Sequence, residues 1–179
     1  MRHTTTADET APESPTSTAL FRIARPELAR ACALTFGGLL AGAFGYGAVN
    51  VLYAFRKVPL DVRFTFHTAL MSVNGLVMQS LMALTALSCL TLAIRSTARD
   101  RWLAATATAL VVGVFLTTRL GNIPINQQIK QWAVAGPPAD YANILSHWET
   151  YHFTRTGLAL LAFLIIVTLT LLPAKEARR

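Results

Sequence analysis

Four long apolar stretches, almost free of charged residues, limit this chain to very few folds. A stretch of about 20 apolar residues is long enough to cross a bilayer as a helix. Such stretches lie at residues 29–55, 66–94, 102–120 and 148–172. Inside a bilayer the backbone polar groups must be satisfied within the protein, which favours helices. We therefore predict an all-α fold, an integral membrane four-helix bundle with a short interfacial helix between helices 3 and 4.

The composition agrees with a membrane protein and argues against several soluble classes. Of the 179 residues, 53% are hydrophobic and only 14% are charged, against about 25% charged in soluble domains. The net charge of +7 comes from Lys and Arg at the ends of the spans, where they anchor to lipid headgroups. No basic stretch alternates with aromatic residues, so we expect no nucleic-acid partner. The expected partner is the lipid bilayer.

The segments outside the spans predict tails and an orientation. Residues 1–20 are rich in Thr, Ala, Glu, Pro and Ser, which predicts a disordered N-terminal tail ahead of a transmembrane domain at 21–173. Residues 174–179 form a basic C-terminal tail. Basic residues are more numerous in segments that share a face with the termini than in the other connections. Positive residues favour the cytoplasm, so we expect a cell-membrane protein with both termini cytoplasmic.

The polar stretch from Arg119 to Arg155 interrupts this apolar chain and is the expected site, near the outer face of the membrane. Trp148, His152 and Arg155 are spaced by four and three positions, which places them on one face of a helix. Ionisable groups below the headgroup level are costly and mark function by default. The alternative to a functional site is that Arg155 extends outward to lipid phosphates and that His152 only caps the loop.

The first part of the same stretch contains two asparagines around a proline, Asn122, Pro124 and Asn126. Proline disfavours a helical conformation in the residue before it, so Pro124 is expected to stop the third helix. The asparagines would then bond to freed backbone groups or to a ligand oxygen; a purely structural helix-end turn is the alternative. The residues that follow predict a short interfacial helix that lies over the bundle like a lid.

The first span is rich in glycine, with Gly38 and Gly42 four positions apart. Small residues at this spacing let another helix approach closely, or they leave room for a flat ligand. Asn50 and Tyr53 add polar groups near the exit end of this span.

A metal site has candidate ligands in His67, His147, Glu149 and His152. The spacing H-x-E-x-x-H puts the two histidines five positions apart, which does not match the helical zinc motif H-E-x-x-H. We therefore expect no metal; if one is present, these four side chains are its expected ligands.

These motifs together resemble a known family. The pattern N-x-P-x-N after the third span, W-x3-H-x2-R at the fourth, and F-G-G-L-L-A-G-A-F in the first resemble the anthrone oxygenase-like membrane proteins. The resemblance covers residues from about 30 to 172. It implies a four-helix membrane fold and, for members in polyketide pathways, oxidation of anthrones to anthraquinones by O2 without flavin or haem.

The residues fit that chemistry. An anthrone has an acidic C–H group, and the carbanion left after its ionisation is electron-rich enough to reduce O2. We expect His152 to act as the base, and Arg155 with Arg119 to stabilise the oxyanion. The residues expected to contact the substrate are Asn122, Asn126, Trp148, Tyr151, Tyr53 and Asn50.

The sequence thus predicts a membrane-embedded oxygenase for a lipophilic polycyclic aromatic substrate, with no cofactor of its own. Two alternatives stay open. One is a non-enzymatic small-molecule-binding or accessory membrane protein, and the other is a metal-dependent membrane oxidase. A homo-oligomer is compatible with either.

Overall fold

The computed structural model describes residues 17–171, with side chains from residue 27 onward. The elements in chain order are α1 (Ser17–Tyr46), η1 (Gly47–Val51), α2 (Leu52–Lys57), α3 (Leu60–Arg95), α4 (Ala98–Thr117), η2 (Thr118–Asn122), α5 (Ile123–Ala135) and α6 (Tyr141–Leu171). Most of the predicted N-terminal tail, and the predicted C-terminal tail, lie outside the described residues. The part of the predicted tail from Ser17 to Leu20 belongs to α1.

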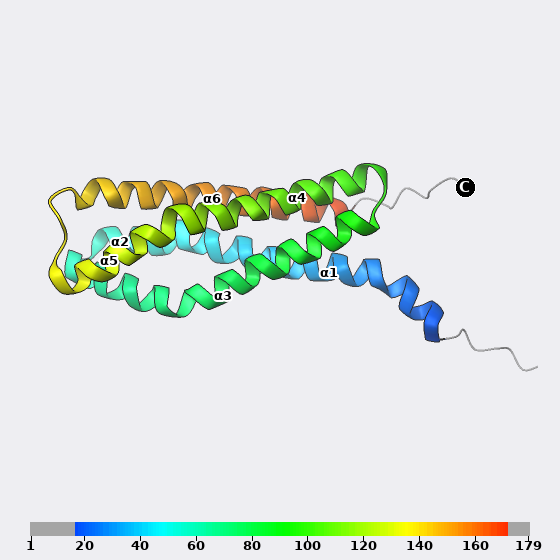
Figure 1. Ribbon diagram of the computed structural model, residues 1–179, viewed down its shortest axis with the longest axis horizontal. Coiled ribbons are helices and arrows are strands. Elements are labelled where there is room, and N and C mark those ends of the chain that lie inside the picture. Colours follow the sequence, from blue (N-terminus) through cyan, green and yellow to red (C-terminus); the bar gives the residue numbers. More distant parts are fainter. Residues whose placement is uncertain (1–16, 172–179) are drawn as a thin grey trace, which may run out of the picture.

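The helices form a bundle of four antiparallel rods (Figure 1). α1 packs beside α3 and α6, and α4 packs beside the same two helices. The α2–α3 turn and the α5–α6 loop lie at one end of the bundle, the loop end (Figure 1). Within the described part of the chain, four helical stretches are long and apolar enough to cross a membrane. The predicted all-α four-helix bundle is therefore confirmed, and the chain is a multi-pass membrane protein.

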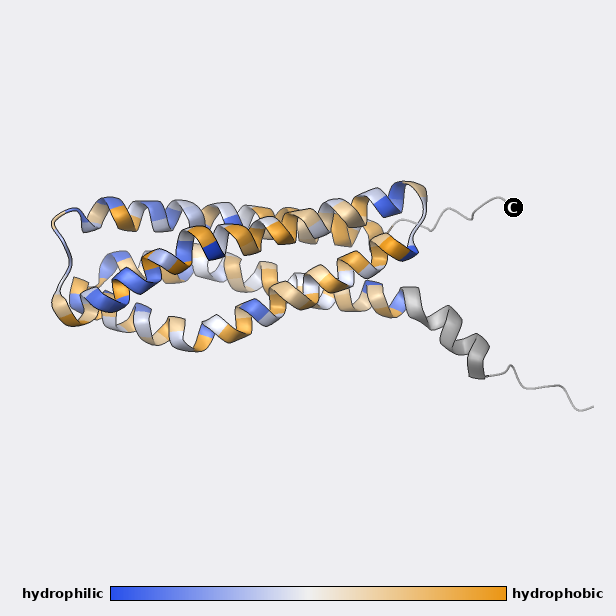
Figure 2. Ribbon diagram, in the orientation of Figure 1, coloured by the Kyte–Doolittle hydropathy of each residue, from blue (hydrophilic) through white to orange (hydrophobic). Residues whose placement is uncertain are grey.

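The interior changes character along the bundle. Towards the α3–α4 connection it is built from small residues, among them the fully buried Ala33, Ala104 and Ala107. Alanine at such positions lets helices approach closely, which favours packing inside a bilayer. At the loop end the interior contains large aromatic residues, including Phe64, Trp132 and Trp148. Hydrophilic residues gather on α5 and the start of α6 (Figure 2), so this half of the bundle carries the polar chemistry.

Pro124 does not stop the third helix, in contrast to the prediction. Residues Ala98–Ala135 form one helical stretch, and Ile123 is helical, with φ −62° and ψ −46°. The physical reason is the π-helical segment η2, which ends at Asn122, so that the proline falls in the first turn of α5. A proline is tolerated there because its missing N–H would be unpaired anyway.

The predicted lid therefore has a different position. α5 follows α4 through η2 and packs mainly against α3 (Figure 1). It extends one rod of the bundle instead of covering its end. The other helices are also longer than the predicted spans, because their polar first and last turns remain helical beyond the apolar stretches.

The η2 segment depends on a glycine. A Cβ atom added to Gly121 would lie 2.5 Å from Cγ of Tyr151, and two further ring atoms would lie within 2.8 Å. Cγ is the ring atom bonded to Cβ, so it can move only if the side chain changes its χ1 rotamer or the helix shifts. Gly121 therefore allows α6 to approach η2 closely.

We predict that Gly121→Ala destabilises the fold by about 1–3 kcal/mol, the usual range for overpacking. Thermal unfolding in detergent, followed by circular dichroism, measures this effect. Gly42→Ala is the matched control, because a Cβ there meets nothing within 4 Å. The control is expected to be neutral or slightly stabilising, since alanine favours a helix over glycine by about 1 kcal/mol. Equal unfolding temperatures for the two variants would contradict this account of Gly121.

Candidate active site

A chamber of about 580 Å³ lies between α1 with η1, α3, η2 with α5, and α6. Both π-helical segments contribute to its wall, η1 through Gly47 and Val51 and η2 through Thr118 and Arg119. Short π segments inside α-helices are frequent at functional sites. The polar side chains in the wall include Asn74, Gln79, Thr118, Arg119, Asn126, Gln127, His152 and Arg155. Methionine and aromatic side chains make up much of the rest.

Arg155 and His152 form a buried hydrogen-bonded pair in this wall. The Arg155 Nη2 atom lies 2.7 Å from Nδ1 of His152, and Nε lies 3.3 Å from the same atom. Only 8% of Arg155 and 5% of His152 are exposed. A guanidinium group only donates hydrogen bonds, so Nδ1 of His152 must supply the lone pair. The ring proton of His152 therefore resides on Nε2.

The N–H group at His152 Nε2 is not used by the described part of the protein itself. Nε2 is buried and has no hydrogen-bond partner among the described residues. The backbone of Gly47 approaches this edge of the ring, because a Cβ on Gly47 would lie 3.1 Å from Nε2. The pair thus offers an N–H donor at the chamber wall, with the cation of Arg155 behind it.

No carboxylate in the described part of the chain pairs with Arg155. Its partners are the His152 ring, the Thr118 hydroxyl at 3.5 Å from Nη1, and the face of Phe44, whose centre is 4.7 Å from Cζ. A cation over an aromatic ring is attracted by the ring quadrupole, but none of these groups neutralises the charge. A buried charge without a counter-ion is costly. The site is therefore suited to an anionic ligand or intermediate.

A second hydrogen-bond network lies next to this pair. The Trp148 Nε1 atom donates to Oδ1 of Asn126 at 2.7 Å. The same oxygen lies 3.0 Å from Nε2 of His67. Indole only donates and a carbonyl oxygen only accepts, so His67 must donate from Nε2. The lone pair of His67 is then on Nδ1, which is buried and has no partner among the described residues.

Trp148 connects the two networks through its ring. It stacks on His152 with 5.2 Å between centroids and an interplanar angle of 5°. The ring of His67 meets it edge to face at 4.8 Å. The two histidines therefore lie against one indole ring. Arg155, which can only donate, sets the proton position of His152, and the Asn126 carbonyl oxygen, which can only accept, sets that of His67.

Several of the predicted site residues come together. Trp148, His152 and Arg155 share one face of α6 and line the chamber, together with Asn126 of α5. Arg119 also lines the chamber, but its side chain is exposed.

The other predicted substrate contacts do not line the chamber. Asn122 is fully buried and donates from Nδ2 to the Trp148 carbonyl oxygen at 3.0 Å, which fastens α6 to η2. The Tyr151 ring packs against Gly121. Tyr53 lies under the Arg56 guanidinium at 5.5 Å, and Asn50 is exposed on η1. The structure gives these four residues positions outside the chamber.

The four candidate metal ligands do not converge. His147 is exposed and bonds to the Asn143 carbonyl oxygen at 2.9 Å, while Glu149 pairs with Arg56 and Arg63. His67 lies beside Asn126 and His152 accepts from Arg155, so the two histidines belong to different networks. Across residues 27–171, no three His, Cys, Asp or Glu side chains gather in a way that could hold a metal ion.

Sequence reasoning missed the residues that complete the Arg155 site. Phe44 and Thr118 are the main omissions. Phe44 ends the F-G-G-L-L-A-G-A-F motif, but nothing in the sequence shows that it or Thr118 would meet Arg155. Gly47 had a weak signal, as one of the glycines of the first span. His67 was considered only as a metal ligand, because nothing in the sequence shows that Asn126 would meet both it and Trp148.

The comparisons with known proteins identify the family of this chain. A family model described as anthrone oxygenase matches residues 66–165, which is more than half of the chain. The match includes His67, Asn126, Trp148, His152 and Arg155. No curated protein and no solved structure matches the chain. Because the family match covers more than half of the sequence, it shows that the chain belongs to the anthrone oxygenase family.

Proposed function

We propose that this protein is a membrane-embedded oxygenase that oxidises a flat, lipophilic, anthrone-like substrate with O2. The observation that carries the proposal is the buried Arg155–His152 pair, which has no carboxylate partner among the described residues and faces a largely apolar chamber. This arrangement suits a substrate that becomes an anion only after it has left water. The family match supports the same class of reaction.

The proposed reaction balances without an external reductant. The methylene carbon of an anthrone loses one proton to water, and the resulting enolate adds O2. The peroxide anion then takes that proton back and becomes a hydroperoxide. Loss of the second C–H proton then breaks the O–O bond and leaves a carbonyl group. The carbon loses four electrons and O2 gains four. One oxygen atom enters the product, and the other leaves as water with both hydrogens.

We assign Arg155 and His152 to the enolate and to the peroxide that follows it. Donors aimed at a developing oxyanion in a water-poor site usually supply a large part of catalysis. In the tautomer that follows from the Arg155 contact, Nε2–H of His152 donates to the oxyanion, and Nε2 has no lone pair to accept a proton. This differs from the role of base expected from the sequence, because Arg155 already occupies the basic nitrogen.

The rest of the chamber suits the same substrate class. Trp148 and Phe44 offer aromatic faces, while Asn126, Gln127 and Asn74 offer amide groups for phenol and carbonyl oxygens. Arg119 supplies a second cation at an exposed position. We propose no resident cofactor, since the substrate itself supplies the electrons. We also propose that both termini are cytoplasmic, which puts the loop end and the chamber towards the outer face.

The role of His152 is tested by two substitutions. Gln presents an N–H group and a carbonyl oxygen at nearly the spacing of the two imidazole nitrogens, but it cannot act as a base. We predict that His152→Gln keeps anthrone-dependent O2 uptake within about tenfold of wild type. His152→Phe is expected to lose on the order of 100-fold, the usual cost of one oxyanion donor. An equally large loss in both variants, with both folded by gel filtration, would instead identify His152 as the base.

Arg155 is expected to be more important than the other cation of the chamber. We predict that Arg155→Gln lowers kcat for O2 uptake by roughly 100-fold or more, because it removes the buried positive charge. Arg119→Gln, which removes an exposed charge from the same wall, is the matched control and should lose far less. If wild-type protein binds the anthrone but consumes no O2, the protein is a binding protein and the proposal fails.

A further inference from the structure

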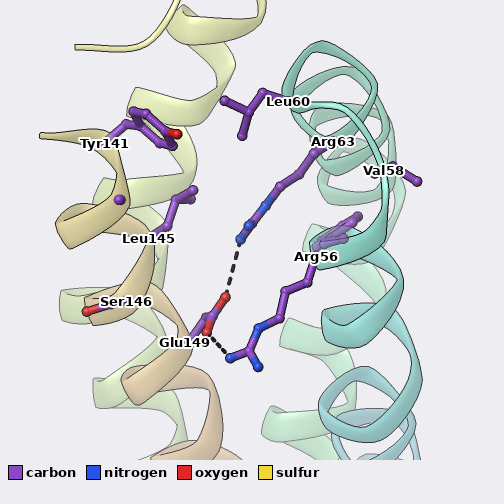
Figure 3. A pocket seen from close by; sticks show the side chains of 10 residues that line it. Arg56, Val58, Leu60, Arg63, Tyr141, Leu145, Ser146 and Glu149 are labelled. Carbon is purple, nitrogen blue, oxygen red and sulfur yellow. Dashed lines mark hydrogen bonds and ion pairs between the residues drawn. The ribbon is translucent and has the colours of Figure 1, made fainter. Parts of the chain in front are cut away.

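A second pocket, of about 330 Å³, opens at the loop end of the bundle. It lies between the α2–α3 turn and the first turns of α6 (Figure 3). Phe55 borders both this pocket and the chamber, and its buried ring stands between them. The chemistry of the proposed oxygenase uses none of the charged groups in this second pocket. Those groups are Arg56, Arg63 and Glu149.

Arg63 is the unusual residue of this pocket. Its side chain points from α3 towards Glu149 on α6 (Figure 3), and only 6% of the residue is exposed. Its ion pair with Glu149 is long, with 3.4 Å between Nη2 and the Glu149 Oε1 atom. Its Nε atom is buried and has no partner among the described residues. A buried guanidinium with an unfilled N–H group is costly unless a ligand completes it.

The charges of the pocket do not cancel. Arg56 pairs with the other oxygen of the same carboxylate, so one Glu149 serves two guanidinium groups. The pocket therefore has a surplus of one positive charge. Two guanidinium groups around a space of this size match an oxyanion, because each can offer parallel N–H donors to two oxygens.

We propose that the pocket of Arg56, Arg63 and Glu149 binds a phosphate-type oxyanion, separate from the oxygenase chamber. The anion accepts hydrogen bonds from Arg63 Nε and from Arg56, and it offsets the surplus charge. Tyr141 and Ser146, which also line the pocket, add hydroxyl groups. The pocket lies where the bundle leaves the apolar layer, so the phosphate belongs either to a lipid headgroup or to a soluble phosphate compound.

Inorganic phosphate is the probe for the first test, with full-length protein in a neutral detergent free of phospholipid. A ligand that binds only the folded state raises the unfolding temperature. We expect phosphate to raise it relative to sodium chloride of equal ionic strength. Arg63→Gln is expected to weaken phosphate binding by about tenfold or more, since it removes a charge-assisted donor. Lys57→Gln removes a charge from the same end of the bundle outside the pocket, and it should respond as wild type does.

The variant Glu149→Gln distinguishes a phosphate site from a purely structural ion cluster. It removes the carboxylate that competes for both guanidinium groups, so phosphate should bind more tightly than in wild type. A structural cluster predicts the opposite pattern, with lower stability and no phosphate response. No response in wild type, an unchanged response in Arg63→Gln, or no gain in Glu149→Gln would each overturn the proposal.

The source of the phosphate follows from a second arm, in phospholipid nanodiscs. If a lipid headgroup is the natural occupant, added phosphate gives a shift in detergent and none in nanodiscs. If a soluble phosphate compound is the occupant, the shift persists in both. Either result supports the site, whereas a shift that is equal in wild type and Arg63→Gln contradicts it. Anthrone oxidation plays no part in this test, so it stands or falls independently of the proposed function.

Discussion

The hydrogen bond from Arg155 to Nδ1 of His152 is the contact on which the candidate site depends. It places a permanent cation inside the bundle and determines which nitrogen of His152 holds the proton. Neither residue could do this alone, because an isolated arginine has no reason to stay buried and a free imidazole can exchange its tautomers. The chemistry proposed for the chamber follows from this one contact.

The backbone around the pair is adapted to it. η1 brings the bare backbone of Gly47 against the His152 ring, and η2 presents Thr118 to Arg155 from the opposite helix. A π segment shifts the residues that follow it around the helix axis, so it redirects side chains without ending the helix. The same segment lets Pro124 remain within a continuous helix. The two irregular segments of the bundle thus both border the chamber.

The sequence predicted the class of fold well, because hydrophobic length and the scarcity of charge are strong constraints inside a bilayer. It also predicted that Trp148, His152 and Arg155 share a face, since helical spacing alone determines this. It failed at Pro124, where a rule for ordinary helices did not anticipate a π segment. Asn122, Tyr151, Tyr53 and Asn50, predicted to contact the substrate, do not line the chamber, because polarity near a site does not show which way a side chain points.

The role of His152 shows a different limit of sequence reasoning. A histidine on the polar face of a membrane helix suggests a base, and the spacing to Arg155 agrees with several roles. Only the atoms in contact distinguish a donor from a base, and those depend on side-chain conformation. The same holds for His67, whose partner Asn126 is fifty-nine positions away in the sequence.

The tautomer of His152 can be measured directly by nitrogen-15 solid-state NMR of histidine-labelled protein in lipid bilayers. The His152 signals are assigned by their loss in His152→Gln. The account predicts a protonated Nε2 and a non-protonated Nδ1 in wild type, with the Nδ1 signal shifted in Arg155→Gln, where its charged donor is absent. A protonated Nδ1 in wild type would contradict the account, because Arg155 could not then donate to it.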